Sequence, residues 1–291
     1  MPLESGARPY SIGNLGMSIR SSLLAATALA AAVAATPAVA QERAARLGPV
    51  VEFGLEGGFM FNESDTAAGF EDSDKYGDLG DLAAGEEGTY FALSGRFHLD
   101  ESFAIDGALT STFLNEDNTS ALGAAGSDGL DYQTLDVSLV YKLGDDFALF
   151  GGVRGLHADN EIEASGFLAS DTIDANVWMG GPRLGAEMDL QFGDFPVGVV
   201  GSVSGSVLFG SVDVEGSYPG MSEGVTTYNL EGSLALSYEI ADGVQLQAGY
   251  RAQQFWNLAP SFSEISTSGY DYDGEGDVLV HGPFAKVHLS F

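Results

Sequence analysis

Residues 228–240 read YNLEGSLALSYEI, and every second side chain in this stretch is apolar or absent. The residues of the two alternating sets would project to opposite sides of an extended chain, because successive side chains of a β-strand alternate between its faces. The apolar set is Tyr228, Leu230, Gly232, Leu234, Leu236, Tyr238 and Ile240, and the other set is Asn229, Glu231, Ser233, Ala235, Ser237 and Glu239. The alternation predicts a strand with one apolar face.

The same alternation recurs along the chain and predicts an all-β fold. Ten segments follow it, and they cover residues 50–61, 89–99, 103–114, 132–143, 147–157, 175–192, 197–209, 227–240, 244–255 and 278–291. Segment 175–192 is the least secure of the ten, because it contains Pro182 and proline cannot donate to a strand ladder. Strand counts of eight or twelve stay open, since boundaries read from a pattern shift by about 2–4 residues.

The charges within these segments all fall on one face. The apolar face of every segment lacks Asp, Glu, Lys and Arg, and the opposite face carries Glu52, Glu56, Arg96, Asp106, Asp136, Lys142, Arg154, Arg183, Glu187, Asp189, Glu231, Glu239, Arg251 and Lys286. Two architectures fit this separation. A soluble barrel or sandwich buries the apolar face, whereas a transmembrane barrel turns it toward lipid and its charges toward the lumen.

The connections between the segments favour the transmembrane barrel. Short turns are expected at 100–102, 144–146, 193–196 and 241–243, and long loops at 62–88, 115–131, 158–174, 211–226 and 257–277. Short periplasmic turns that alternate with long extracellular loops are typical of outer-membrane barrels. An even number of antiparallel strands then places both termini of the chain on the periplasmic side.

Aromatic residues of the apolar faces gather near both ends of the expected strands. One set lies beside the short turns and comprises Phe97, Phe103, Tyr141, Phe147, Phe192, Tyr238 and Phe291. A second set lies toward the long loops and comprises Phe59, Phe61, Phe91, Phe113, Phe209 and Tyr228. Two such bands match the aromatic girdles that flank the lipid-facing zone of outer-membrane barrels.

The final strand ends in Val287, Leu289 and Phe291, which alternate with polar residues. A terminal Phe with apolar residues two and four positions before it resembles the recognition signal for outer-membrane barrel assembly. We therefore expect the barrel-assembly machinery and periplasmic chaperones as partners, together with outer-membrane lipids and lipopolysaccharide. The oligomeric state cannot be read from the sequence.

The N-terminal region has the form of a secretory signal peptide. From Met17 the chain reads MSIRSSLLAATALAAAVAATPAVAQ, with Arg20 before an apolar stretch and Ala38 and Ala40 forming an A-x-A cleavage motif. This order of basic, apolar and small residues is the signature of an exported protein. We expect residues 1–16 to precede the true start codon, residues 17–40 to be the signal peptide, and residues 41–291 to form the barrel.

The composition excludes several classes of protein. Lys and Arg number 11 against 42 Asp and Glu, for a formal net charge of −31, which argues against a nucleic-acid partner. The absence of cysteine excludes a disulfide scaffold and a thiolate nucleophile. The 45% of hydrophobic residues is too large a share for a disordered acidic chain.

A barrel of ten strands has a narrow lumen, because an eight-stranded barrel is already filled by its own side chains. The candidates for lumen or constriction residues are Glu52, Glu56, Arg96, Asp106, Asp136, Lys142, Arg154, Arg183, Glu187, Glu231, Arg251 and Lys286. These charges of both signs could form a packed network of ion pairs, or they could select solutes at a constriction. Both interpretations stay open.

Three short blocks resemble a known family. They are Met179-Gly-Gly-Pro-Arg-Leu-Gly185, Gly249-Tyr-Arg-Ala-Gln-Gln-Phe-Trp-Asn257 and His281-Gly-Pro-Phe-Ala-Lys-Val287. They resemble segments of the Legionella-type major outer membrane protein family, which implies a pore-forming outer-membrane barrel. The chain departs from the family in having no cysteine, so the resemblance does not imply disulfide-linked oligomers.

The polar residues near the long loops offer little chemistry. A protease would need a His–Asp pair with further carboxylates at the rim, and residues 157–159 (His-Ala-Asp) are the one local candidate. Residues 271–277 (DYDGEGD) begin like a calcium loop, but the twelfth position is Gly282 where a bidentate Glu is required. We therefore expect no catalytic residues, no bound metal and no cofactor.

The leading functional hypothesis is a porin-like, pore-forming protein of the cell outer membrane that passes small solutes or ions. The alternative is a closed structural or adhesin-like barrel that displays acidic extracellular loops. We expect a protein that is not an enzyme in either case.

Overall fold

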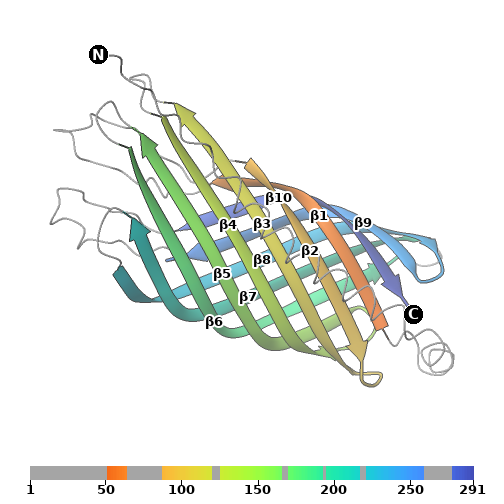
Figure 1. Cartoon of the computed structure of the whole chain (residues 1–291). Coiled ribbons are helices and arrows are strands. Elements are labelled where there is room, and N and C mark those ends of the chain that lie inside the picture. Colours follow the sequence, from red (N-terminus) through yellow and green to blue (C-terminus); the bar gives the residue numbers. More distant parts are fainter. Residues whose placement is uncertain are drawn as a thin grey trace, which may run out of the picture. The chain divides into compact units, whose positions relative to one another are not determined.

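The computed structural model describes residues 51–63, 87–119, 125–165, 170–192, 195–216, 221–258 and 277–291. Within these ranges the chain forms ten antiparallel strands that close into one barrel (Figure 1). The strands are β1 (Val51–Glu63), β2 (Glu87–His98), β3 (Phe103–Thr119), β4 (Ala125–Lys142), β5 (Phe147–Ser165), β6 (Ser170–Gln191), β7 (Val197–Gly216), β8 (Met221–Ala241), β9 (Val244–Trp256) and β10 (Val278–Ser290). The all-β class and the count of ten strands are confirmed.

Each strand pairs with its neighbours in sequence, and β1 pairs with β10 to close the barrel. At this seam Glu52 lies opposite Ser290, and Val51 and Phe291 exchange two backbone hydrogen bonds, of 3.4 Å and 3.0 Å. Figure 1 shows the orange β1 running beside the blue β10. No helix in the described ranges has the length and apolarity needed to cross a membrane.

The barrel turns its apolar residues outward, as a membrane barrel must. Leu135 on β4, Val153 on β5 and Leu184 on β6 are 57%, 58% and 71% exposed. Their inward neighbours Asp136 and Arg154 are buried. A soluble barrel would show the opposite arrangement, so the lipid-facing interpretation of the apolar phase is confirmed.

Aromatic side chains lie on the outer face near both ends of the strands. Most members of the two predicted bands are exposed, for example Phe147 near a short turn and Phe59 at the other end. The outer face also exposes Trp178 on β6 and Trp256 on β9, which the sequence analysis did not place in a band. Side chains of this kind suit the boundary between hydrocarbon and headgroups.

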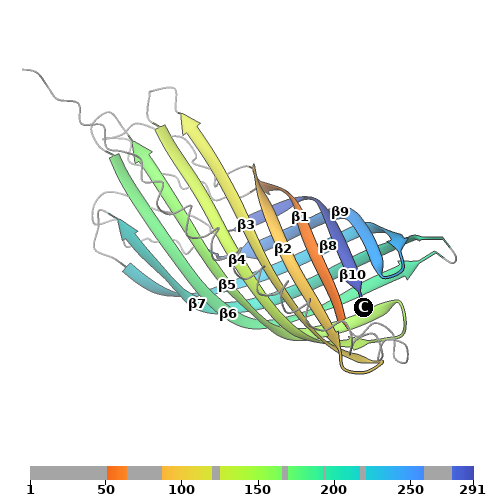
Figure 2. The ribbon, with the colours of Figure 1, turned by 45° about the vertical axis from the view of Figure 1, so that its right-hand side comes forward.

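Three of the predicted long loops are wrong. The structure continues the β-ladder through most of 115–131, 158–174 and 211–226, so that Thr119 pairs with Ala125 and Ser165 with Ser170. The six strands β3–β8 have 17 to 22 residues, whereas β1, β2, β9 and β10 have 12 or 13. Figures 1 and 2 show β3 and β4 running on past the end of β2.

The polarity of the two faces inverts along these long strands, and this inversion explains the error. The inversion lies in the part of each strand beyond the aromatic girdle that is opposite the short turns. There the outward residues Asp159 on β5 and Asp213 on β7 are exposed, while their inward neighbours Ala158 and Val212 are buried. The outer face there contacts water and has no need for apolar residues. A search for one continuous apolar face therefore stops at the lipid boundary, although the backbone pairing continues. Some of the acidic residues by which Asp and Glu outnumber Lys and Arg therefore lie on strand faces and not in loops.

Pro182 does not interrupt β6. On one side of the strand the register continues through the pair Val153 and Pro182. On the other side the pairing with β7 skips from Gly180 to Arg183, because proline has no N–H to donate. The doubt that the sequence analysis attached to this strand therefore applies to one edge of it only.

Two of the short turns depend on glycine. Gly144 has a φ of 103° and Gly243 a φ of 73°, values that side-chain-bearing residues rarely adopt. Together with residues 99–102 and the connection around residues 192–197, they bring neighbouring strands back at one end of the barrel, which we call the short-turn end. This end faces the periplasm in outer-membrane barrels.

The expected signal peptide at 17–40, its cleavage residues Ala38 and Ala40, and the segment 1–16 lie outside the described residues. The same is true of the calcium-like residues 271–276 and of most of the loop predicted at 62–88.

Candidate functional site in the barrel lumen

The predicted lumen residues share the inner face of the barrel. All of them except Arg154 line one cavity, and these are Glu52, Glu56, Arg96, Asp106, Asp136, Lys142, Arg183, Glu187, Glu231, Arg251 and Lys286. Arg154 is buried, with 1% of its side chain exposed. The structure also shows how they are grouped, which the sequence alone could not.

Arg154 on β5 and Asp136 on the adjacent β4 form the most enclosed ion pair. The guanidinium donates from Nε to Oδ1 and from Nη2 to Oδ2 of Asp136, and both distances are 2.7 Å. The two residues are direct cross-strand partners in the register. This fork geometry suits Arg better than Lys, because the planar group offers two parallel donors.

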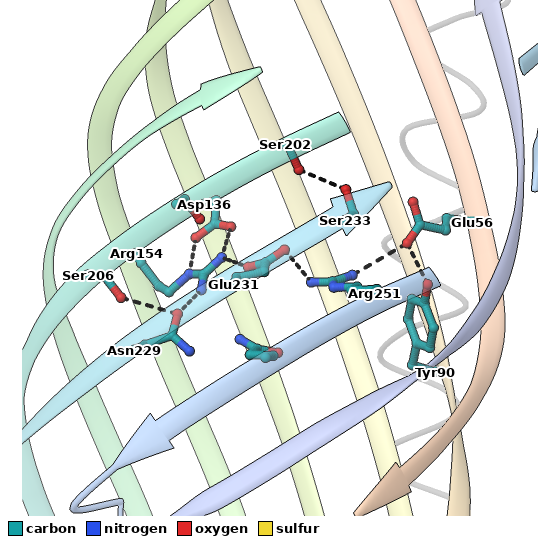
Figure 3. A network of polar contacts seen from close by, with 12 residues as sticks. Glu56, Tyr90, Asp136, Arg154, Ser202, Ser206, Asn229, Glu231, Ser233 and Arg251 are labelled. Carbon is teal, nitrogen blue, oxygen red and sulfur yellow. Dashed lines mark hydrogen bonds and ion pairs between the residues drawn. The ribbon is translucent and has the colours of Figure 1, made fainter. Parts of the chain in front are cut away.

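The same guanidinium reaches β8, three strands away around the barrel (Figure 3). Its Nη2 lies 2.7 Å from Oε2 of Glu231, and its Nη1 donates to the side-chain oxygen of Asn229 at 2.5 Å. Arg154 therefore joins two separate parts of the barrel wall. With four short contacts it has few donors left to offer.

Glu231 extends this connection toward β1 and β2. Its Oε1 accepts from Nη2 of Arg251 at 2.8 Å, and Nη1 of Arg251 lies 3.4 Å from Oε1 of Glu56. The phenol of Tyr90 donates to the same Glu56 oxygen at 2.6 Å. Figure 3 shows these groups as an unbroken chain of polar contacts from Asp136 to Tyr90. We call this set, with Arg154, Glu231, Arg251 and Glu56, the charge chain.

A second ion pair spans the lumen closer to the short-turn end. Arg96 on β2 donates from Nη1 and Nη2 to the two carboxylate oxygens of Glu187 on β6, each at 2.7 Å. The two strands are four places apart around the barrel, so the pair crosses the interior. Arg96 also lies 3.3 Å from Asp106 of the adjacent strand β3.

At the short-turn end Glu52 lies between two histidines. Its Oε1 is 2.6 Å from Nε2 of His98, and its Oε2 is 3.4 Å from Nε2 of His288. Within the described residues no group of three or more His, Cys, Asp or Glu side chains is arranged to hold a metal ion.

Beyond the charge chain, toward the end of the barrel opposite the short turns, aromatic side chains meet across the lumen. Tyr132 on β4 and Phe255 on β9 form an edge-to-face pair, with ring centroids 5.5 Å apart. The phenol of Tyr132 also donates to Oε1 of Gln253 at 3.1 Å. Because β4 and β9 are five places apart in a ring of ten strands, these contacts join opposite walls. We call Tyr132, Gln253 and Phe255 the aromatic bridge.

The two rings of the aromatic bridge, Tyr132 and Phe255, belong to a larger apolar cluster inside the barrel, which the sequence analysis missed. Its members include Met60, Tyr90, Leu114, Leu130, Leu156, Met179, Leu208, Val212, Val225, Val278 and Val280. These residues occupy the inward phase of their strands, and all of these strands except β7 carry inward charges closer to the short-turn end. A count of bulky inward residues along each strand would have revealed them.

The cavity of about 460 Å³ occupies the interior between the short turns and the charge chain. Its lining runs from turn residues such as Asp145 and Gly243 to Arg183, Glu231 and Arg251. We call this cavity the vestibule. It is open toward the short-turn end, and the charge chain and the aromatic bridge lie at its inner end.

The predicted rim pair does not face the lumen. His157 on β5 lies 3.6 Å from Asp159, and Asn176 of β6 donates to Asp159 at 2.5 Å. These residues belong to the outward phase of β5 and β6, beside the exposed Trp178, whose ring stacks on His157 at 4.0 Å. They form a polar patch on the outer wall at the level of the girdle.

Known structures with a similar fold are outer-membrane barrels. The outer membrane protease OmpT from Escherichia coli matches with a TM-score of 0.54 and 9% identity, over 83% of this chain and 96% of that chain. The translocator domain of the autotransporter NalP from Neisseria meningitidis gives 0.46 and 13% identity, over 97% and 100%. Neisserial surface protein A gives 0.36 and 14%, over 83% and 97%. The match to OmpT, at 9% identity, supports the fold alone.

No curated protein matches the sequence. A family model described as the Legionella pneumophila major outer membrane protein precursor matches residues 132–291, which is more than half of the chain. That stretch includes all three blocks on which the resemblance was noted, and it contains Arg154, Arg183, Glu231 and Arg251. The chain is an outer-membrane β-barrel and belongs to the Legionella major outer membrane protein family.

Proposed function

We propose that this protein acts as a closed outer-membrane barrel, which anchors and displays acidic surface segments and does not serve as a permanently open channel. The aromatic bridge carries this proposal. Tyr132 contacts both Gln253 and Phe255 from the opposite wall, so side chains occupy the line that a solute would follow. Lumen closure by side chains is typical of barrels close to eight strands.

The charge chain is a second barrier. Arg154, Glu231 and Arg251 are held by ion pairs of 2.7 Å and 2.8 Å, and little of their side chains is exposed. Opening a path through this layer would separate a buried charge from its partner. Breaking a buried pair by removing one partner costs about 3–5 kcal/mol, so the closed arrangement is strongly favoured.

The segments available for display are strongly acidic. Residues 64–86, between β1 and β2, contain Asp65, Glu71, Asp72, Asp74, Asp78, Asp81 and Glu86. They follow the end of β1 that is opposite the short turns, which is the extracellular side in this class of barrel. Such a segment suits adhesion, or contact with lipopolysaccharide through divalent cations.

Liposome swelling tests the closed lumen. Liposomes that contain the refolded barrel should swell in isotonic arabinose no faster than protein-free liposomes, while a general porin as the positive control swells rapidly. Porin-like swelling rates would contradict the closed-barrel proposal.

Surface display has a separate test. A variant that lacks residues 66–84 should still assemble into a heat-modifiable barrel and should lose attachment to host cells or abiotic surfaces. A deletion of residues 261–270, which contain a single acidic residue, is the control for loss of a segment and should leave attachment unchanged. Unchanged attachment in both variants would contradict the display role.

The second candidate function is a small porin-like pore, and the vestibule favours it. A cavity of about 460 Å³ lined by charges of both signs reaches from the short-turn end to the charge chain. Such a pore would require the aromatic bridge to separate. We propose no catalytic role, because His157 and Asp159 lie on the outer wall, away from any cavity wall described above.

A further inference from the structure

We propose that the vestibule is a binding site for a small zwitterion, and that Arg183 is the group that receives its carboxylate. A free amino acid is the representative ligand class. This inference goes beyond the closed-barrel function, because it concerns a site reached from the short-turn end and does not depend on whether the lumen conducts.

Arg183 differs from the other lumen arginines in how little of its hydrogen-bonding capacity is used. Arg154 makes four contacts of 2.7 Å or less, and Arg96 holds Glu187 through two of 2.7 Å. Arg183 lies 3.5 Å from Asp136 and 3.9 Å from Glu231, and its one short contact is the 3.0 Å hydrogen bond to Ser204. Its Nε is buried and has no hydrogen-bond partner, which is also true of the Nε atoms of Arg96 and Arg251.

Both carboxylates near Arg183 are already committed to other arginines. Asp136 is held by the fork of Arg154, and Glu231 by Arg154 and Arg251 at 2.7 Å and 2.8 Å. An incoming carboxylate could therefore take the donors of Arg183 and give up only long contacts. Bidentate binding of a carboxylate is the interaction for which a guanidinium is best suited.

The aromatic ring of Phe150 holds the guanidinium of Arg183 in its orientation. Its guanidinium carbon lies 4.7 Å from the ring centroid of Phe150 on β5, a cation–π geometry. The ring occupies space that a side chain at position 185 would need, because a Cβ built on Gly185 would lie 2.3 Å from Cζ of Phe150. The small residue at 185 thus lets Phe150 lie beneath the guanidinium, which is held ready for a ligand.

Arg183 is reachable from the vestibule. Both Arg183 and Phe150 line this cavity, and 14% of the Arg183 side chain is exposed, compared with 1% for Arg154. The volume of about 460 Å³ is ample for an amino acid. The charge chain and the aromatic bridge prevent such a molecule from continuing through the barrel.

The charge of the vestibule argues for a zwitterion over a simple anion. Carboxylates outnumber Lys and Arg among its lining residues. Asp106 and Glu187 share Arg96 as their ion-pair partner, so these three residues together carry a formal charge of −1. A simple anion would be repelled on its way to Arg183, whereas a ligand that also carries an ammonium group would be attracted to the acidic walls.

Calorimetry on the refolded barrel in detergent tests the proposal, with L-lysine as the probe, an amino acid that carries the zwitterionic group and a further side-chain ammonium group. Acetate and n-butylamine represent its carboxylate half and its side-chain half. L-lysine should bind measurably, and each half should bind at least about tenfold more weakly. Arg183→Lys keeps the charge but removes the fork, and should weaken L-lysine binding about 10- to 100-fold through lost charge-assisted hydrogen bonds.

Lys142→Arg is the control, because Lys142 lines the same cavity, forms no ion pair within the described ranges and is not among the groups proposed to hold the ligand. It should leave the affinity within about threefold. Heat-modifiable migration of each variant shows that the barrel has folded. Equal binding by Arg183→Lys and wild type, no heat with L-lysine, or acetate binding as tight as L-lysine would each overturn the proposal. A conducting barrel that still binds L-lysine through Arg183 would overturn only the closed-barrel function.

Discussion

The ring of Tyr132 on β4 meets the ring of Phe255 on β9 at 5.5 Å, edge to face, although the two strands stand on opposite sides of the barrel. Tyr132 is 1% exposed and Phe255 is fully buried. Aromatic pairs in this geometry contribute about 0.5–1.5 kcal/mol beyond the burial of their surface. The contact therefore both stabilises the barrel and fills its interior.

Removing this bridge should open the lumen. The double variant Tyr132→Ala, Phe255→Ala deletes both rings, and arabinose flux into liposomes should rise at least severalfold over wild type. Each truncation removes buried aromatic surface and is expected to cost about 3–5 kcal/mol in stability. The flux measurement is therefore made on barrels that still show heat-modifiable migration.

Tyr141→Ala, Phe147→Ala is the matched control, because these aromatic residues lie on the outer face of the same barrel and are 44% and 52% exposed. It should leave the flux at the wild-type level. An increase in flux of equal size in both double variants would show that general loosening, and not the bridge, controls permeation.

Arg154 should be the single most important lumen residue for stability. Arg154→Met leaves Asp136 and Glu231 buried without their 2.7 Å partner, which should lower the free energy of unfolding by about 3–5 kcal/mol. Urea unfolding of the barrel in lipid vesicles measures this change. Lys142→Met is the control: Lys142 lines the vestibule, forms no ion pair within the described ranges, and should change stability by less than about 1 kcal/mol. Similar losses for both variants would contradict the importance given to the charge chain.

The Arg96–Glu187 pair can be tested by exchanging its charges. Arg96→Glu and Glu187→Arg each place like charges where two 2.7 Å hydrogen bonds now lie, and each should lower the unfolding midpoint. The double exchange restores an attractive pair across the lumen and should recover at least half of the summed loss. Simple additivity of the two single changes would show that the residues do not interact in the folded barrel.

The sequence predicted whether each residue lies on the inner or the outer face of the barrel, but not its position along the barrel axis. A period of two assigns Glu56, Arg154 and Glu231 to the inner face without any further information. Which of them meet depends on strand tilt and on the stagger of ten strands, and these are properties of the closed barrel. The contact between Tyr132 and Phe255 could not be predicted for the same reason, since it depends on the positions of both opposite walls.

The lengths of the strands show where the pattern fails. Residues 222–226 continue the ladder of β8, yet the outward positions there are Ser222, Gly224 and Thr226, which lack the apolar side chains that lipid requires. Hydrogen bonding between strands does not depend on this change in side-chain polarity, because it is made by the backbone. Sequence patterns therefore located the lipid-facing zone and underestimated the strands.

Phe291 is predicted to be needed for assembly in cells. Its backbone bonds to Val51 across the seam between β1 and β10, and its ring lies 6.4 Å from that of Phe53. Phe291→Ala should lower the amount of assembled barrel in the outer membrane severalfold, as measured by the heat-modifiable band. Phe147→Ala, at an exposed girdle position away from the seam, should not. Normal assembly of Phe291→Ala would remove the terminal residue from the proposed signal.

Planar-bilayer recording on the purified wild-type barrel tests the central claim, a lumen closed by the aromatic bridge and the charge chain, most directly. We expect no steady channel events from wild type and clear events from Tyr132→Ala, Phe255→Ala under the same salt and voltage. Frequent, long-lived openings of wild type, of the same size as those of the double variant, would contradict this claim.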